Sequence, residues 1–237
     1  MKNLKNWDKK TWLSSSKYSL SVINFLEKRI KFNKEIKILD VGCGRGKIIS
    51  ILSKKYQMNN LPLGIDIVDH KDVAKKIRFI KINALNYLNK TNFFFDLILF
   101  KQSIHFFKFN EIKKILMLSK KNLNPNGQII ILALHPKQNH WPLFKLFKSK
   151  LVKSLIKDEV ILGLIKSSFK RYKVNYFKFQ VEIKKNSYLK MIKNRFTSCL
   201  LSLSHKELKN GMKEIKEKYK NKLVFSDQLI CISYKKK

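Results

Sequence analysis

The stretch from Ile38 to Ile49 constrains the fold of this chain more than any other. A short apolar run ends at Asp40, glycines follow at Gly42, Gly44 and Gly46, and an amphipathic helical pattern then begins. This order predicts a strand, a tight turn and a helix. Alternating glycines let the backbone turn sharply without a Cβ atom, and the start of a helix presents free N–H groups. The stretch therefore predicts a nucleotide-type binding site.

Spacing separates three kinds of site that begin in this way. A dinucleotide site requires G-x-G-x-x-G, but Lys47 stands where the third glycine belongs. A phosphate-binding loop requires G-x-x-x-x-G-K-[ST], but Val41 and Ile48 replace its first glycine and its hydroxyl residue. The remaining pattern, D-x-G-x-G-x-G directly after a strand, resembles the first motif of the class I S-adenosylmethionine-dependent methyltransferases. A glycine-rich turn with a purely structural role is the alternative.

An acidic residue follows at the interval that this fold requires. Asp66 ends a second predicted strand and stands twenty residues beyond Gly46. One crossover helix and a returning parallel strand need about that many residues, so the carboxylate is expected beside the glycine turn. There it can accept hydrogen bonds from both hydroxyls of a ribose. Capping of the following turn is the alternative, and the spacing favours the ribose role.

The resemblance implies roles for further residues at the strand ends. A third predicted strand, from Ile77 to Ala84, ends in Asn83 where the family usually has an acid. The Asn83 side-chain oxygen is expected to accept from the adenine amino group, and the Ala84 N–H to serve a ring nitrogen. Gly42 and Gly44 are expected to lie under the methionine portion, with Asp40 engaging its amino group or holding the loop. The predicted cofactor contacts also include Cys43, Ile67 and Lys101.

A fourth predicted strand, from Phe93 to Phe100, leads into a loop with one titratable histidine, His105. An F-D-x-x-x strand followed by a polar residue and an aromatic pair is similar to the family's fourth motif. The resemblance implies that this loop faces the methyl group, so His105 is the candidate base or substrate-orienting group. Packing against Phe106 and Phe107 is the alternative. The Asn/Asp-Pro-Pro-aromatic signature of nucleic-acid amino-methylating enzymes and the Pro-Cys nucleophile of RNA cytosine methylation are both absent.

The C-terminal part predicts a fifth strand from Gln128 to Leu134 and then an insertion. Two helices, from Tyr188 to Leu200 and from Lys206 to Tyr219, separate a sixth strand from the last one. This helical crossing resembles the small-molecule branch of the family, which includes trans-aconitate methyltransferase. Substrate contacts are expected from the insertion and from Tyr188 and Arg195. Arg195 could clamp a carboxylate, and a surface salt bridge is the alternative.

We therefore predict an α/β fold of the Rossmann-like methyltransferase type. It is a three-layer sandwich with a largely parallel seven-stranded sheet and an antiparallel last strand. Residues 1–237 are expected to form one domain. Within it, residues 1–33 form an N-terminal helical cap that carries Trp7, Trp12 and Tyr18, and residues 136–173 form a substrate lid.

The formal net charge of +36 raises the question of a nucleic-acid partner. Only five of the 52 basic residues are arginine, the residue favoured for bidentate phosphate and base contacts. The lysines are spread along the chain, and A- and T-rich codons would by themselves produce such an excess. We interpret the charge as a solvated lysine-rich surface rather than a dedicated nucleic-acid face. Non-specific binding to polyanions is expected in either case.

The cysteines and the hydropathy pattern bear on the compartment. Three widely separated cysteines show no C-x-x-C spacing, so neither a metal site nor a disulfide framework is expected. No signal peptide and no membrane span is predicted. The expected location is the cytoplasm, and the oligomeric state is not predicted.

The predicted activity is methyl transfer from S-adenosylmethionine to a small-molecule acceptor. Methylation of RNA is one alternative, since the charge permits it. A cofactor-binding protein that is inactive or regulatory is the other.

Overall fold

The computed structural model describes residues 11–237, which divide into two compact units. Unit 1 comprises the described residues up to Ser21, together with His135–Asp158 and Lys178–Gln228. Unit 2 comprises Val22–Leu134, Glu159–Phe177 and Leu229–Lys237. The prediction of a single domain with a cap and a lid stays a prediction. Trp7 and the rest of residues 1–10 lie outside the described residues.

A seven-stranded sheet has the order β3-β2-β1-β4-β5-β7-β6. Strands β1 to β5 pair in parallel, and β7 runs antiparallel to β5 from the pair Gln128 and Lys235 to the pair Leu134 and Leu229. This confirms the predicted fold class. The strands are β1 (Ile38–Val41), β2 (Leu63–Asp66), β3 (Arg78–Lys81), β4 (Phe95–Lys101), β5 (Leu123–Leu134), β6 (Lys173–Lys184) and β7 (Lys222–Lys235).

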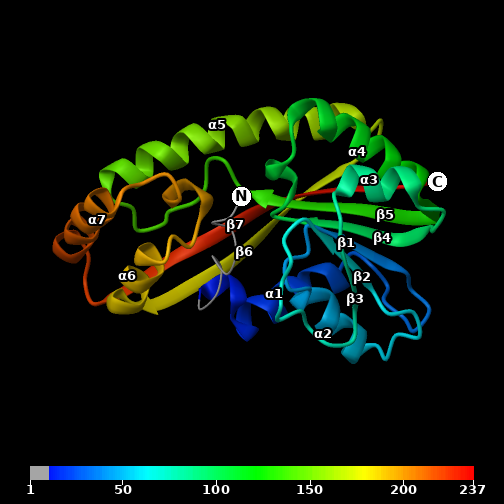
Figure 1. The fold of residues 1–237 in the computed structure, drawn as a ribbon, viewed down its shortest axis with the longest axis horizontal. Helices are drawn as coiled ribbons and strands as arrows, with labels where there is room; N and C mark the ends of the chain where they lie inside the picture. Colours follow the sequence, from blue (N-terminus) through cyan, green and yellow to red (C-terminus); the bar gives the residue numbers. More distant parts are fainter. Residues whose placement is uncertain (1–10) are drawn as a thin grey trace. The chain divides into compact units, whose positions relative to one another are not determined.

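Helices cover both faces of the parallel strands in unit 2. In Figure 1, α2 lies on one face and α3 and α4 lie on the other. The α-helices are α1 (Ser16–Glu27), α2 (Lys47–Lys55), α3 (Ala84–Lys90), α4 (Phe109–Lys121), α5 (Lys145–Ser168), α6 (Lys185–Lys193) and α7 (His205–Lys218). Short 3-10 helices are η2 (Trp12–Ser14), η3 (Ile104–Phe106) and η4 (Ser198–Leu200).

The core of unit 2 explains why its strands are nearly continuous apolar runs. Every residue of β1 is buried, and in β4 Leu97, Ile98, Leu99 and Phe100 are completely buried. Strands covered by helices on both faces bury successive side chains rather than alternate ones. Because β1 pairs in parallel with β2 and β4, the carboxyl ends of these strands lie at one edge of the sheet, where their loops carry the polar residues.

Unit 1 is built around an aromatic cluster, which we define as Trp12, Trp141, Tyr188, Phe196 and Phe225. The Trp12 ring centroid lies 5.5 Å from that of Trp141, 5.0 Å from that of Phe196 and 5.2 Å from that of Phe225. Each ring is buried. Such offset and edge-to-face pairs stabilise a core beyond the area that they bury.

Two elements differ from the sequence-based expectation. The helix α3 was not expected, and it begins because the Asn83 side chain caps the N–H groups of Leu85 and Asn86. The helix expected up to Leu200 ends instead at Lys193, since Arg195 has a positive φ of 53° that stops an α-helix. Among residues 11–237, no helix combines the length and the apolar character that a membrane crossing requires.

Candidate functional site

The turn after β1 has a backbone that only glycine adopts readily. Gly42 and Gly44 have φ angles of 71° and 56°, in the left-handed region that a Cβ atom disfavours. The N–H groups of Gly42 and Cys43 both donate to the Ile65 carbonyl of β2, at 2.8 and 3.1 Å. The turn is therefore fixed against the neighbouring strand before the helix α2 begins at Lys47.

The glycines of this turn differ in what lies beside them. A Cβ atom on Gly42 would come within 2.5 Å of the Ser103 Cβ atom, and one on Gly46 would overlap the Ile77 side chain. A Cβ atom on Gly44 would meet nothing within 4 Å. Gly42 and Gly46 are thus required for close packing, whereas Gly44 borders open space that a ligand can fill.

Asp66 lies at the end of β2 and holds the glycine turn. Its Oδ2 atom accepts a hydrogen bond from the Gly44 N–H at 2.9 Å, and its Oδ1 atom accepts from the Val68 N–H at 2.9 Å. Each carboxylate oxygen can accept two hydrogen bonds, so one position on each oxygen remains. The next residue, Ile67, is 41% exposed and leaves an apolar side chain beside this carboxylate.

Asp40 is a second carboxyl group at the same edge, and it is buried. Only 4% of the residue is exposed, and its Oδ1 atom has no hydrogen-bond partner among residues 11–237. Burial raises the pKa of the Asp40 carboxyl to about 7, with Lys101 lowering it and Asp66 raising it. A buried carboxyl oxygen without a donor is costly, so this atom suits a positively charged ligand group.

Cys43 lies in the same turn and is no nucleophile there. Burial raises the pKa of the Cys43 thiol, and the neighbouring Asp40 and Asp66 raise it further. The thiol therefore stays protonated, and its Sγ atom donates to the Gly44 carbonyl at 3.4 Å.

Asn83 caps α3 with the oxygen that was expected to accept from adenine. Its Oδ1 atom accepts from the Leu85 N–H at 2.8 Å and from the Asn86 N–H at 3.4 Å. Both acceptor positions of that oxygen are thereby engaged. The side-chain amide and the N–H of Ala84, which lies in the first turn of α3, are the donors available for a base.

The end of β4 and the loop after it carry three residues that have different partners. Ser103 Oγ donates to the Val41 carbonyl at 2.6 Å and so joins this loop to the end of β1. Lys101 Nζ donates to Gln102 Oε1 at 3.1 Å. His105 lies in η3, with its ring centroid 4.1 Å from that of the half-exposed Phe106.

An ion pair that the sequence analysis missed holds the far side of the glycine turn. Arg45 Nε donates to Asp72 Oδ2 at 2.9 Å, and the Ala74 N–H donates to the Arg45 carbonyl at 2.9 Å. These bonds join the loop after β2 to the turn. No local pattern marks the pair, because its members are 27 residues apart and both belong to irregular segments.

Comparison with known proteins identifies this part of the chain. The sequence from Leu39 to Ile131 matches the family model described as a methyltransferase domain. Residues 39–131 are thus similar to a methyltransferase domain. This match confirms the prediction of a methyltransferase and, with it, the prediction of S-adenosylmethionine as the cofactor. No curated protein sequence matches the chain significantly.

Solved structures resemble most of the chain in fold. One is a protein from Anabaena variabilis ATCC 29413 that is described as a putative methyltransferase from an antibiotic biosynthesis pathway. It is 13% identical to this chain with a TM-score of 0.64, and the match covers 90% of this chain and 96% of the Anabaena chain. An S-adenosylmethionine-dependent methyltransferase from Archaeoglobus fulgidus is 18% identical with a TM-score of 0.55, covering 92% and 94%. One from Geobacter sulfurreducens, solved with S-adenosylhomocysteine, is 13% identical with a TM-score of 0.52, covering 92% and 90%.

The predicted cofactor residues of the methyltransferase domain all lie in unit 2, whereas the predicted substrate residues lie in unit 1. Tyr188 is completely buried, and its hydroxyl donates to the Pro142 carbonyl at 2.7 Å. Arg195 Nη1 donates to the carbonyls of Leu200 and Leu203 at 2.9 and 2.7 Å. Both side chains thus bond to the protein's own backbone, and their contact with a substrate stays a prediction.

No metal site is evident in the part of the chain that the structure describes. In residues 11–237, histidine, cysteine and acidic side chains form no group of three or more that could hold an ion.

Proposed function

We propose that this methyltransferase transfers the methyl group of S-adenosylmethionine to a small-molecule acceptor, with the donor held at the edge formed by β1, β2 and β4. One observation carries the placement of the donor. Gly44 borders open space while its N–H is fixed by Asp66, and the unpartnered oxygen of Asp40 is buried at the end of the neighbouring strand. These groups fit the cofactor.

Each part of the cofactor has a matching group in this proposal. Asp40 pairs with the methionine ammonium, and Lys101 lies close enough to Asp40 to lower its pKa and to serve the cofactor's carboxylate. The remaining acceptor positions of Asp66 take the ribose hydroxyls. The exposed Ile67 side chain packs on the adenine ring, which removes apolar surface from water.

The two remaining cofactor contacts concern adenine and the turn. The adenine ring receives hydrogen bonds from the Ala84 N–H and the Asn83 amide rather than giving one to the Asn83 oxygen, since that oxygen caps α3. The backbone of Gly42, Cys43 and Gly44 forms the floor under the methionine portion. The turn is held from behind by the bond between Ser103 and the Val41 carbonyl.

The cofactor supplies an activated methyl group on a sulfonium, which an acceptor atom displaces in line. The protein contributes by aligning the two reactants and excluding water. A base is required only where the acceptor atom carries a proton. We assign that role to His105 because it lies in the loop that follows β4. The carboxyl end of β4 lies at the same edge of the sheet as the proposed donor site.

The pairing of Asp40 with an ammonium predicts a pH dependence of cofactor binding. The folded-state pKa of Asp40, about 7, lies above the ordinary value of a carboxyl group, so the cofactor-free protein loses stability as pH rises toward that value. Ionised Asp40 binds a cation, so S-adenosylhomocysteine affinity is expected to rise roughly tenfold between about pH 5.5 and about pH 7.5. Calorimetric titration across this range measures it. Asp40→Asn should flatten the profile, and an unchanged slope in that variant contradicts the pairing.

Replacement of His105 separates a catalytic role from packing. His105→Ala is expected to lower kcat at least about tenfold while S-adenosylhomocysteine affinity stays within about twofold. His105→Phe keeps an aromatic ring beside Phe106 but carries no titratable nitrogen. Steady-state kinetics should therefore find both variants slow. Normal turnover in His105→Phe would assign the residue to packing alone.

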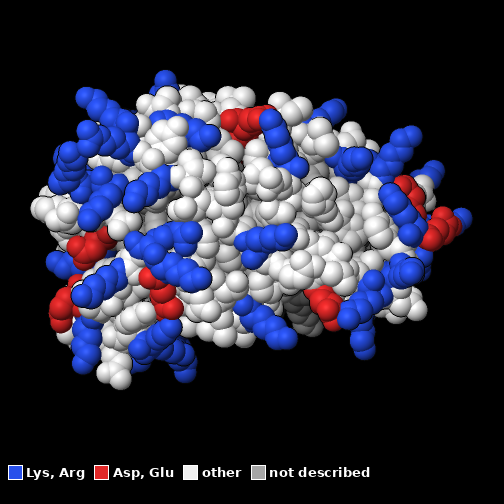
Figure 2. All heavy atoms as spheres, turned by 180° about the vertical axis from the view of Figure 1, so that it is seen from behind, with Lys and Arg blue, Asp and Glu red and all other residues white. Residues whose placement is uncertain are grey.

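The small-molecule acceptor is favoured over RNA by the distribution of charge. Figure 2 shows Lys and Arg side chains spread over one face of the molecule rather than gathered in one block. Only five arginines are present, and arginine is the residue favoured for bidentate contacts with phosphate. We propose that the reaction takes place in the cytoplasm, a compartment that suits three free cysteines. The same charge supports non-specific binding of polyanions and makes RNA methylation the second candidate function.

A single set of measurements tests these candidates. The full chain is titrated with S-adenosylhomocysteine and then given labelled S-adenosylmethionine with a panel of small molecules and RNA at increasing salt. Methylation of a small molecule with little dependence on salt supports the proposal. RNA methylation that falls steeply with salt favours the second candidate. Binding without turnover indicates an inactive cofactor-binding protein, and failure to bind overturns the placement of the donor.

A further inference from the structure

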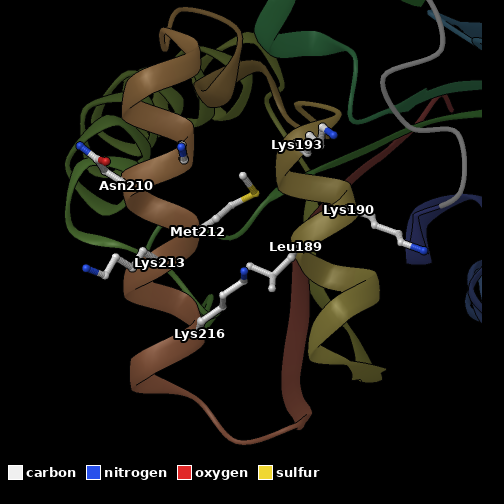
Figure 3. A pocket seen from close by; sticks show the side chains of 8 residues that line it. Leu189, Lys190, Lys193, Asn210, Met212, Lys213 and Lys216 are labelled. Carbon is white, nitrogen blue, oxygen red and sulfur yellow. The ribbon is translucent and has the colours of Figure 1, made fainter.

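A groove of about 400 Å³ lies between α6 and α7 in unit 1. Figure 3 shows Leu189 of α6 and Met212 of α7 pointing toward one another across it, with Lys216 reaching across from α7. Leu189 is 7% exposed, so the floor of the groove is formed by side chains that the fold holds in place. A volume of this size lies in the range of small-ligand sites, about 300–1,000 Å³.

The rim of this groove carries positive charge only. Five of its eight lining residues are lysines, and the others are Leu189, Asn210 and Met212. Lys190, Lys193, Lys209 and Lys216 are exposed, and no ion pair of their side chains occurs among residues 11–237. Of the acidic residues of α7, Glu207 accepts from the Ser204 N–H and Glu214 from the Lys145 N–H, and Glu217 pairs with Lys213, one of the five lysines. An anion in the groove would therefore relieve repulsion between like charges.

The groove differs from a nucleic-acid surface in its composition. Among its lining residues there is no aromatic side chain on which a base could stack. It offers an apolar floor, buried at Leu189 and half-buried at Met212, flanked by lysines. A lysine can lay its aliphatic stem along apolar surface while its charged end stays in water. These features match one molecule that has an apolar chain and an anionic end.

We propose that the α6–α7 groove binds a single-chain anionic amphiphile of the alkyl phosphate type. The apolar chain lies on Leu189 and Met212, and the phosphate group lies among the lysines of the rim. Lysine binds phosphate as a point charge, so no fixed fork of donors is needed. This proposal does not depend on the proposed methyl-transfer reaction, because neither the residues of the α6–α7 groove nor the amphiphile take part in that reaction.

Calorimetric titration of the full chain with dodecyl phosphate and with inorganic phosphate, at constant salt, tests the proposal. Dodecyl phosphate is expected to bind at least about tenfold more tightly than inorganic phosphate, because only the former buries a chain. Met212→Glu places a carboxylate on the floor of the groove and should lower the affinity for dodecyl phosphate at least about tenfold. Equal affinity for the two phosphates would overturn the assignment of an amphiphile.

A matched pair of charge variants removes the effect of overall charge. The double variant Lys193→Glu/Lys216→Glu should weaken dodecyl phosphate at least about tenfold, while Lys113→Glu/Lys114→Glu on the exposed face of α4 changes it less than about twofold. Both variants lower the net charge equally. Thermal melting verifies that each variant is folded. If both double variants weakened the binding of dodecyl phosphate equally, its affinity would depend on net charge rather than on the groove, and the proposal would be overturned.

Discussion

Asp66→Ala is expected to weaken S-adenosylhomocysteine binding at least about 100-fold. The carboxylate holds the Gly44 N–H and the Val68 N–H, and we propose that its remaining acceptor positions take both ribose hydroxyls. A hydrogen bond to a charged group contributes about 1.5–3 kcal/mol, so loss of two costs about 3–6 kcal/mol of binding free energy. Calorimetry on the variant measures the loss. A decrease smaller than about tenfold would contradict the ribose assignment.

A matched control and a modified ligand separate the ribose contact from support of the turn. Asp69→Ala removes an exposed carboxylate from the same loop and should change affinity by less than about twofold. The natural protein should prefer S-adenosylhomocysteine over its deoxyribose analogue, because Asp66 accepts from both hydroxyls. Asp66→Ala should lose this preference. A variant that still discriminates between the two ligands would limit Asp66 to holding the turn.

The parts of this site that could be predicted from the sequence are those that local geometry determines. Three glycines at alternate positions specify a turn with positive φ angles, and all three have them. An interval of twenty residues between Gly46 and Asp66 allows one crossover helix and one parallel strand, and Asp66 does reach the N–H of Gly44. A residue's place at a strand end is thus visible in the order of apolar runs and turns.

The residues that escaped the sequence analysis act through contacts between distant segments. Ser103 reaches the Val41 carbonyl across 62 residues, and Arg45 reaches Asp72 across 27. Neither pair belongs to a periodic pattern or a motif in the sequence, because both contacts depend on how the loops at one edge of the sheet meet. The same limit applies to the unpartnered oxygen of Asp40, since its burial depends on several elements of unit 2.

The C-terminal part illustrates a second limit, which concerns side chains that a sequence shows as polar or aromatic. Tyr188 and Arg195 have the chemistry of substrate-binding residues, but Tyr188 packs in the aromatic cluster and bonds to the Pro142 carbonyl. Arg195 bonds to the backbone that follows α6. Helical periodicity predicted α6, yet it could not indicate which of its polar atoms the fold itself would use.

Gly42→Ala and Gly44→Ala are expected to lower stability to different extents and to have similar effects on cofactor binding. At Gly42, a Cβ atom would lie 2.5 Å from the Ser103 Cβ atom and force apart the loops after β1 and β4. Left-handed strain of about 1–2 kcal/mol and overpacking of about 1–3 kcal/mol should together lower the free energy of unfolding by several kcal/mol. Gly44→Ala adds only the strain, because its Cβ atom meets nothing within 4 Å.

Cofactor binding then distinguishes packing from ligand contact. The added methyl group of Gly44→Ala would occupy the open space that we assign to the methionine portion, so S-adenosylhomocysteine affinity should fall at least about tenfold in a protein that melts nearly normally. Gly42→Ala should lose affinity together with stability. Urea unfolding and calorimetry on the two variants make the comparison. If Gly44→Ala bound the cofactor normally, the ligand could not lie against Gly44, and the open space beside the turn would need another occupant.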